Sequence, residues 1–237
     1  MTQLKTLKRE LNLSIIIPTL NEAKNLPLLL SDLAEIREQS EIIIIDSNSE
    51  DATKDISNIY GAAYHNIKES NRGLQLNTGA KKAQGNWLLF LHADSRLNRN
   101  WSEEISQIIS RYRNSIYFFN FKVNNKNLIF RFLELMVKLR FLFLRTPYGD
   151  QGLLIHRNIY FKYKGYKKIP IMEDIDFINR LKVKEFLYLL NSSILTSSRK
   201  WQRNNFLHQS IINFRLRRKW SKGYPLDEIY KKYYQNK

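Results

Sequence analysis

Three apolar runs that each stop abruptly at polar side chains constrain the fold of this chain more than any other feature. Residues 88–91 read Leu-Leu-Phe-Leu and are followed at once by His-Ala-Asp at 92–94. The runs at 13–17 and 42–45 end in the same way, the second of them directly before Asp46. Continuous apolar runs of this length are typical of parallel strands that are covered on both faces. Because the carboxyl ends of parallel strands meet at one edge of an α/β sheet, we expect these polar groups to line a crevice there.

Strand-like and helix-like segments alternate along most of the chain. The expected strands cover residues 13–17, 42–45, 62–65, 87–91, 116–123 and 153–155. The expected helices cover residues 24–37, 51–60, 73–83, 101–112, 127–143 and 172–182. This alternation predicts an α/β fold with a Rossmann-like, doubly wound and mainly parallel central sheet, flanking helices and extra C-terminal helices. With 237 residues, of which 43% are hydrophobic, the chain can bury one full core, so we expect a single domain over 1–237.

The composition excludes several kinds of site. The chain has no cysteine, so it forms neither a disulfide nor a thiolate metal site, and its four histidines are scattered without ligand spacing. The first apolar run has only the length of a strand, and no stretch of about 18 apolar residues occurs. We therefore expect a cytoplasmic protein without a secretory leader or a membrane-spanning helix.

The net charge of +17 would attract polyanions such as nucleic acid. Its distribution argues against such a partner, because the basic residues crowd after about position 110, whereas the carboxylates lie in the first half and at 173–176. Lys, Asn and Ile are all abundant, as in proteins of AT-rich genomes, and this bias raises the Lys content without any partner. We expect an acidic cleft with basic flanks and no specific nucleic acid. A non-catalytic basic α/β protein that binds nucleotides or nucleic acid stays an alternative.

Two acidic segments have a structural explanation that competes with a functional one. Asp46 can cap the helix expected over 51–60, and the acids at 173–176 suit the positive N-terminal end of a helix. Three successive strand ends with polar groups nevertheless favour a site that includes Asp46. Apolar residues at 177–181 bury one face of the second helix, which turns at least one of its acids toward the interior or a cleft.

Motifs spread over nearly the whole chain occur in a characteristic order. They are Ile16–Glu22, the turn at Asp46, Arg72-Gly73 to Asn77-Gly79-Ala80, Leu91–Asp94, Gly149–Gly152, Glu173-Asp174 and Ser198–Trp201. The ordered series resembles glycosyltransferase family 2, and most closely its small stand-alone bacterial branch, some members of which are labelled arsenosugar-biosynthesis-like. The resemblance implies a GT-A fold, a nucleotide-diphosphate sugar donor, a divalent cation (Mg²⁺ or Mn²⁺) and inversion at the anomeric carbon.

The resemblance also assigns roles residue by residue. The nucleotide pocket would be lined by Pro18, Asn21, Glu22, Asp46 and Arg72. Asp94 would hold the cation, and hard cations do prefer oxygen ligands. His92 replaces the first acid of the family's Asp-x-Asp element, so whether it contacts the metal or the ribose stays open. Asp174 matches the general base, with Glu173 as the alternative, and a carboxylate that takes the proton of an acceptor hydroxyl typically contributes about 10²–10⁴-fold to the rate.

Two further segments are expected near the acceptor. Asp150 and Gln151 lie between glycines, in a loop that can approach sugar hydroxyls closely, although an ordinary tight turn explains them as well. Ser198–Trp201 looks like a reduced version of the family's Arg-Trp element, which places Arg199 and Trp201 near the diphosphate or the acceptor. The domain then divides into a nucleotide-binding half at 1–115, an acceptor and catalytic half at 116–202, and a helical extension at 203–237.

Two amphipathic stretches leave the partner of their apolar faces open. Over 127–145 the apolar face is wider than a surface helix needs. It either packs in the core or in a homodimer, or it lies on an anionic membrane with Lys and Arg at its flank. Over 203–222 the basic cluster Arg215–Lys219 is either a solvated face or a second element that faces a membrane or a diphosphate. The acceptor is correspondingly a sugar, a lipid-linked molecule or a small molecule.

A second enzyme class, the nucleotidylyltransferases, shares a similar nucleotide-binding fold. These enzymes usually carry a Gly-rich phosphate loop and an Arg/Lys signature near the first strand. The sequence has neither of these features. Glycosyl transfer is therefore the leading hypothesis.

Overall fold

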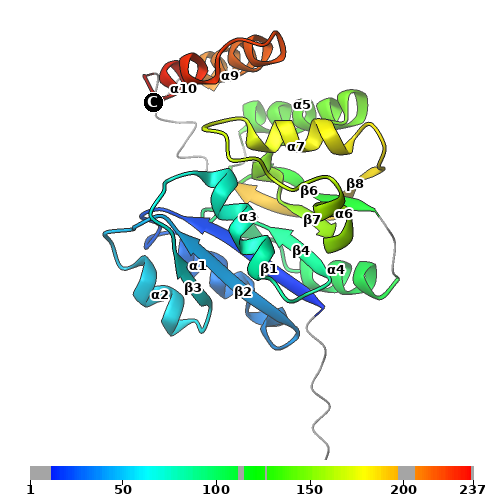
Figure 1. The fold of residues 1–237 in the computed structure, drawn as a ribbon. Coiled ribbons are helices and arrows are strands. Elements are labelled where there is room, and N and C mark those ends of the chain that lie inside the picture. The colour runs from blue at the N-terminus through cyan, green and yellow to red at the C-terminus, as the bar shows by residue number, and fades with distance from the viewer. Residues whose placement is uncertain (1–11, 112–114, 126, 197–205, 236–237) are drawn as a thin grey trace, which may run out of the picture.

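An eight-stranded sheet forms the centre of the computed structural model, which describes residues 12–111, 115–125, 127–196 and 206–235 (Figure 1). The strand order is β3-β2-β1-β4-β7-β6-β8-β5. The strands are β1 (Leu13–Thr19), β2 (Ser40–Asp46), β3 (Ala63–Asn66), β4 (Trp87–Phe90), β5 (Arg96–Leu97), β6 (Ile116–Val123), β7 (Leu153–His156) and β8 (Leu187–Thr196). The pairs of β1 with β2, β1 with β4, β2 with β3 and β6 with β8 are parallel, whereas β7 is antiparallel to β4 and β6, and β5 to β8.

Helices cover both faces of the sheet. They are α1 (Leu26–Asp32), η1 (Ala34–Gln39), α2 (Thr53–Ile59), α3 (Arg72–Lys82), α4 (Trp101–Ser110), α5 (Leu128–Leu144), η2 (Gly149–Gln151), α6 (Arg157–Lys162), α7 (Glu173–Leu181), α9 (Phe206–Ser221) and α10 (Leu226–Gln235). On β1, Ile15 and Ile17 pack in a core with α1 and α4, whereas Ile16 packs in a second core with α3, α6 and α7. The expected α/β architecture, a mainly parallel sheet between two helical layers, is confirmed.

The parallel strands β1 and β2 end at the same edge of the sheet. Thr19, the last residue of β1, lies opposite Asp46, the last residue of β2. The side-chain amide of Gln75 on α3 donates to the carbonyl oxygens of Thr19 (2.9 Å) and Ile45 (2.8 Å), so α3 lies over these strand ends. The polar residues that follow the strands therefore gather at this edge, as the sequence predicts.

Three elements are not among those expected from the sequence, and one expected helix has other bounds in the structure. The strand β5 has two residues and the helix α6 has six, so neither is long enough to show a clear periodic pattern, and β8 is also absent from the expected elements. The helix expected over 24–37 is α1 followed by the 3₁₀ helix η1. It begins at Leu26 because Pro27 sits in its first turn, where the missing N–H costs little.

The strand β8 is not predicted from the sequence because its middle is polar. Asn191, Ser192 and Ser193 interrupt the apolar pattern, and its register against β6 shifts at this point. The carboxylate of Glu104 on α4 accepts the N–H groups of Asn191 (2.8 Å) and Ser192 (2.7 Å). A residue 87 positions away from Asn191 thus stabilises the irregularity, which no local pattern reveals.

The helices α9 and α10 form a pair at one end of the molecule (Figure 1, orange to red). Leu216 and Ile229 of this pair are buried together with Ile171 and Met172, the two residues that precede α7. The pair therefore rests on the segment that leads into the acids at 173–176, and the expected C-terminal helices are confirmed. None of the helices in the described part of the chain combines the length and the apolar character that crossing a bilayer requires.

Candidate active site

A pocket opens at the carboxyl edge of the sheet, between the end of β4 and the first turns of α3 and α7. Its walls are formed by Arg72, Leu76, Phe90, Leu91, His92, Gly149, Leu153, Tyr166, Glu173 and Asp174. These residues belong to segments that are far apart in the sequence. Among the residues singled out in the sequence, the pocket brings together the arginine, the histidine and the two adjacent acids.

Asp174 presents a partly exposed carboxylate to the pocket. The N–H of Gly149 donates to its Oδ2 (2.9 Å), and the N–H of Ile175 donates to its Oδ1 (2.8 Å). A Cβ on Gly149 would lie 3.2 Å from Asp174 Oδ2 and 3.2 Å from His92 Nε2, so the glycine lets the η2 turn pass closely between these two side chains. Each carboxylate oxygen keeps a second lone pair, so Asp174 can still accept the proton of a hydroxyl.

Glu173, the neighbour of Asp174, is turned to the interior and paired with Arg72. It is only 2% exposed, and its Oε1 accepts a hydrogen bond from Arg72 Nε. Burial raises the pKa of Glu173, Arg72 opposes this rise, and the charge of Asp174 adds to it. The geometry therefore favours Asp174 as the base and favours Glu173 as the residue that holds Arg72 at the pocket.

Glu173→Gln is expected to lower the free energy of unfolding by about 1.5–3 kcal/mol, because it removes a charged hydrogen bond from a buried position. Turnover should fall less than in Asp174→Asn, since glutamine preserves the shape of the site and Asp174 stays in place. Chemical denaturation and kcat, measured on the same preparation, check both expectations. A loss of turnover larger than that of Asp174→Asn would exchange the roles of the two acids.

The first turn of α3 is in close contact with the segment that precedes α7. Asn71 caps α3, because its Oδ1 accepts the N–H of Leu74 (2.9 Å), and its Nδ2 donates to the carbonyl oxygen of Ile169 (3.1 Å). A Cβ on Gly73 would lie 2.1 Å from the carbonyl oxygen of Lys167. Gly73 thus allows the close backbone approach that brings the first turns of α3 and α7 together.

Gly73→Ala is expected to destabilise the fold by about 1–3 kcal/mol, the cost of forcing an extra carbon into a packed contact. Helix propensity alone predicts that the variant is more stable, because alanine is about 1 kcal/mol more favourable than glycine within a helix. The sign of the change in unfolding free energy in a urea titration decides between the two effects. A more stable variant would show that the backbone at Lys167 yields to the added methyl group.

Asp46, at the end of β2, is fully buried and surrounded by hydrogen-bond donors. It accepts from Thr19 Oγ1 (2.7 Å), Ser49 N (2.8 Å), Ser49 Oγ (2.6 Å) and Tyr64 Oη (3.0 Å). Burial, together with the hydrogen bond to Asp46 and its charge, raises the pKa of Tyr64 to about 12, so the phenol stays a donor at neutral pH. The structure thus places Asp46 behind the strand ends, where it joins β1, β3 and the loop after β2.

Asn21 and Glu22 tie the loop after β1 to the loop after β2 and to the first residue of α2. The N–H of Asn21 donates to Ser49 Oγ (2.7 Å), and the N–H of Glu22 donates to Thr53 Oγ1 (3.0 Å). Asn21 adopts a left-handed backbone conformation (φ 55°), which asparagine tolerates better than most residues. With Pro18, which is half-buried near the end of β1, these residues form a hydrogen-bonded rim at the same edge of the sheet as the pocket.

His92 and Asp94 lie in the segment that follows β4. His92 lines the pocket, whereas Asp94, two residues further along, is partly exposed and is not among the residues that line it. Within the residues that the structure describes, no three His, Asp or Glu side chains are grouped as a metal site. A cation such as Mg²⁺ commonly uses one or two carboxylates and completes its shell with water and substrate phosphates. The donors at 92–94 fit an open site of that kind.

Asp150 and Gln151, both expected to face an acceptor, differ in their surroundings. Gln151 is buried, its Oε1 accepts from Arg140 Nη2 (3.1 Å), and its Nε2 donates to the carbonyl oxygen of Phe119 (3.3 Å). Gln151 therefore anchors the η2 turn to α5 and β6. Asp150, in the middle of the same turn, is only half-buried.

Two arginines that the sequence analysis does not assign to the pocket hold the residue before the η2 turn. The guanidinium carbons of Arg140 on α5 and Arg217 on α9 lie 3.4 Å and 4.4 Å from the ring centre of Tyr148. A sequence signal for Arg140 exists, since it departs from the helical spacing of Arg131 and Lys138 and falls on another side of α5. The position of Arg217 depends on how α9 packs, which the local sequence does not reveal.

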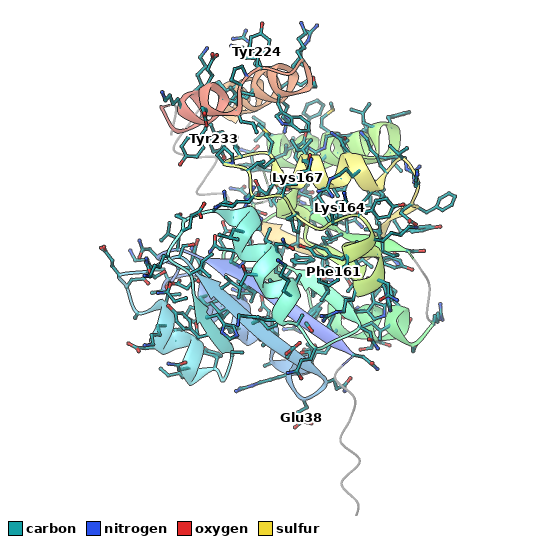
Figure 2. All side chains as sticks on the ribbon, viewed as in Figure 1. Glu38, Phe161, Lys164, Lys167, Tyr224 and Tyr233 are labelled. Carbon is teal, nitrogen blue, oxygen red and sulfur yellow. The ribbon has the colours of Figure 1, made fainter. Side chains whose placement is uncertain are left out.

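The predicted acceptor residues Arg199 and Trp201 lie outside the described residues, so their roles stay predictions. The described part of the C-terminal pair does approach the pocket. Tyr233 on α10 lies on the side of this helix that faces the rest of the molecule, whereas Tyr224, in the segment between α9 and α10, lies on the outer side of the pair (Figure 2). Tyr233 also interacts electrostatically with Arg72.

Solved structures of glycosyltransferases have a similar fold. TarS from S. aureus in complex with UDP is 17% identical, has a TM-score of 0.64, and is matched over 78% of this chain and 60% of its own. Glucosyl-3-phosphoglycerate synthase from Mycobacterium tuberculosis in complex with Mn²⁺, uridine-diphosphate and phosphoglyceric acid is 15% identical, with a TM-score of 0.59 over 90% of this chain and 79% of its own. Identities this low show the fold alone, and the expected GT-A fold is confirmed.

Curated relatives match in part of their sequence. The PGL/p-HBAD biosynthesis glycosyltransferase of Mycobacterium bovis (strain BCG / Pasteur 1173P2) is 40% identical over 91 residues, which are 35% of this chain and 36% of the relative. The 4,4'-diaponeurosporenoate glycosyltransferase of Staphylococcus haemolyticus is 34% identical over 116 residues, which are 45% of this chain and 30% of the relative. The chain thus spans about a third of the length of these relatives.

The sequence profile of one family covers most of the sheet and most of the pocket. It is described as "Glycosyl transferase family 2" and matches residues 14–171, from β1 to the residue before Met172. This range is well over half of the chain and includes the rim, the His92–Asp94 segment and the η2 turn. On this match, the chain belongs to glycosyl transferase family 2.

Proposed function

We propose that the protein transfers a sugar from a nucleoside diphosphate sugar to an acceptor hydroxyl and inverts the anomeric centre. The observation that carries the proposal is the partly exposed carboxylate of Asp174, oriented by Gly149 in a pocket that also contains Arg72 and His92. A hydroxyl nucleophile needs a proton acceptor, and a diphosphate leaving group needs positive charge. Membership of the family and the similar fold of the UDP complex of TarS support a nucleotide-linked donor.

In the proposed reaction Asp174 acts as the general base. The acceptor oxygen forms a bond to the anomeric carbon while the bond from that carbon to the diphosphate oxygen breaks, and the hydroxyl proton moves to a carboxylate oxygen of Asp174. A single displacement of this kind inverts the configuration of the carbon. The N–H groups of Gly149 and Ile175 keep the carboxylate in one orientation, which reduces the entropy that must be lost on reaching the transition state.

Positive charge for the leaving diphosphate would come from two places. Arg72 is the first residue of α3, so the helix N-terminus adds to its positive potential, and Glu173 fixes its direction. A bound Mg²⁺ or Mn²⁺ would offset the negative charge that develops on the diphosphate. Asp94, with His92 beside it, would hold this cation. The Mn²⁺ in the solved structure of glucosyl-3-phosphoglycerate synthase supports a metal-assisted reaction.

The rim formed by Pro18, Asn21 and Glu22 would hold the nucleoside. Asp46, whose carboxylate is occupied by protein donors, would act as a positioning residue that supports this rim from behind. Because the rim is built from two loops joined by hydrogen bonds, a bound base would meet a largely preformed surface.

The acceptor side remains a set of proposals. Asp150 would contact the acceptor, Gln151 would position the η2 turn, and Arg199 and Trp201 would lie near the diphosphate or the acceptor. We also propose a cytoplasmic location for the enzyme. A homodimer stays a prediction.

Incubation with a panel of nucleoside diphosphate sugars, with and without Mn²⁺, tests the proposed function. Release of free nucleoside diphosphate from one donor, faster with Mn²⁺, is the expected result. A thermal-shift screen with nucleotides provides an independent readout, because a ligand at about 100 times its dissociation constant adds about 2.7 kcal/mol of stability. Stabilisation by nucleotides without release from any sugar donor would favour the non-catalytic alternative.

A further inference from the structure

The outward side of α5 is apolar along its whole length. Leu128 is 83% exposed, Phe132 60% and Phe143 80%. The other exposed apolar residues of this side are Ile129, Leu135, Met136 and Leu142. At 3.6 residues per turn these positions fall on one broad side of the helix. Isolated exposed apolar residues are common, but a continuous row of this length on one helix is not.

The opposite side of α5 attaches the helix to the body. Phe130 and Phe141 are the buried residues of the helix, and Phe130 packs with Phe121 and Val123 of β6. Packing in the protein's own core therefore accounts for the inner side of α5 alone. The outward side needs another partner, and the sequence leaves two candidates: a second copy of the chain and a membrane.

Exposed apolar side chains continue beyond the C-terminal end of α5. Phe186 and Val183 are among the most exposed apolar residues of the described chain. Arg145, the residue that ends α5, places its guanidinium carbon 5.8 Å from the ring centre of Phe186. We call the outward side of α5 together with residues 183–186 the apolar face.

We infer that the apolar face docks on an anionic lipid bilayer. Lys138 lies along one flank of α5, and Lys184 lies within the 183–186 segment, and both are exposed. An interfacial helix buries its apolar side at the boundary of headgroups and acyl chains while flanking cations meet anionic lipids. The net charge of +17 favours this partner and opposes a second copy of the chain, because two such copies repel each other.

Docking in this way would set a groove beside the lipid headgroups. The groove lies between α5, β6 and β8, and its polar lining includes Lys122, Glu134, Asn191 and Gln151. Gln151 belongs to the same η2 turn as Gly149, which orients Asp174. The position of the apolar face next to this groove is therefore compatible with an acceptor that comes from the bilayer. The docking itself does not depend on the proposed chemistry.

Co-sedimentation with vesicles of phosphatidylglycerol and phosphatidylcholine tests the inference. The protein should bind these vesicles and should bind pure phosphatidylcholine vesicles much more weakly. It should dissociate from the anionic vesicles when the salt concentration is high enough to screen surface charges. Phe132→Glu combined with Phe143→Glu should weaken binding roughly tenfold or more, because both apolar contacts are replaced by charges that anionic lipids repel. Charge reversal within the basic cluster Arg215–Lys219 is a less suitable test, because Arg217 of this cluster stacks on Tyr148 beside the η2 turn.

Ile59→Glu is a control for replacing an exposed apolar residue by a charge elsewhere on the surface, to be compared with Phe132→Glu alone as well as with the double variant. Ile59 is 78% exposed on α2, which packs at the β3 end of the sheet, far from α5 along the strand order. This variant should bind vesicles as the unmodified protein does.

Two outcomes overturn the inference. The first is that the unmodified protein fails to bind phosphatidylglycerol vesicles at low salt. The second is that the α5 double variant binds these vesicles as strongly as the unmodified protein. A dimer in solution that the α5 double variant dissociates, without vesicle binding, would assign the face to a second copy. Nucleoside diphosphate release is measured without vesicles, so failure of the proposed function is distinguishable from failure of the docking.

Discussion

Asp174→Asn is expected to lower kcat by about two to four orders of magnitude while donor binding persists. Asparagine has nearly the same size and keeps a carbonyl oxygen that can accept one of the N–H groups of Gly149 and Ile175. It cannot take the proton of the acceptor hydroxyl at neutral pH, so the loss should fall on the chemical step. Turnover at saturating donor and the donor Kd from calorimetry, both on the same variant, separate this effect from a loss of binding.

Asp55→Asn is a suitable control for this prediction. Asp55 lies exposed on α2, away from the pocket, so the same chemical change should leave kcat unaltered. Analysis of the product by NMR should show an inverted anomeric centre. Retention would contradict a single displacement, and near-normal turnover in a folded Asp174→Asn variant would take the role of base away from Asp174.

Asp94→Asn is expected to abolish stimulation of turnover by Mn²⁺ and to weaken nucleotide binding in the presence of the metal. The neutral amide keeps the shape of the side chain but removes the negative charge that makes a carboxylate a stronger ligand for a hard cation than an amide oxygen. Nucleotide affinity without metal should change little, because this residue is assigned to the cation alone. Titrations of nucleotide affinity and of turnover against Mn²⁺ concentration measure both effects.

The fold of the Asp94→Asn variant should stay intact, since Asp94 is partly exposed beyond the end of β4. An unchanged thermal midpoint in the absence of nucleotide verifies this. If the variant retains a normal response to Mn²⁺, the cation is held by other donors, and His92→Ala becomes the next variant to test. Nucleotide affinity that drops equally with and without metal would instead assign Asp94 to the nucleotide.

The sequence by itself predicts the parallel part of the sheet and its functional edge. The run at 88–91 has enough contiguous apolar residues to specify a buried strand locally, and β4 covers Trp87–Phe90. The strand expected over 116–123 occupies those residues as β6. Because parallel strands share the edge at which they end, the order of polar residues along the chain is enough to predict that they meet. Of these polar residues His92 lines the pocket, together with Arg72, Glu173 and Asp174, which lie in the first turns of α3 and α7.

The tertiary structure decides which of two adjacent acids is buried in an ion pair and which keeps a partly exposed carboxylate. Glu173 and Asp174 have similar chemistry and neighbouring positions, so in the sequence only the resemblance to the family, which favours Asp174, separates them. Arg72 on α3 pairs with the first acid, and Gly149 in the η2 turn binds the second. Asp46 is a similar case, because Thr19, Ser49 and Tyr64 surround it only once three separate segments have come together.

The strand β8 and the helix α5 are two further cases in which residues distant in the chain decide the structure. The polar middle of β8 is stable as a strand because Glu104 on α4 binds its backbone, and nothing within 187–196 indicates that partner. The sequence of α5 shows that its apolar surface is broad, but contact with Phe121 and Val123 of β6 decides which side is covered. Local sequence determines the preferred backbone conformation and the apolar pattern of each segment, since both depend on neighbouring residues. The partner of each side chain depends on residues distant in the chain, so the tertiary structure alone determines it.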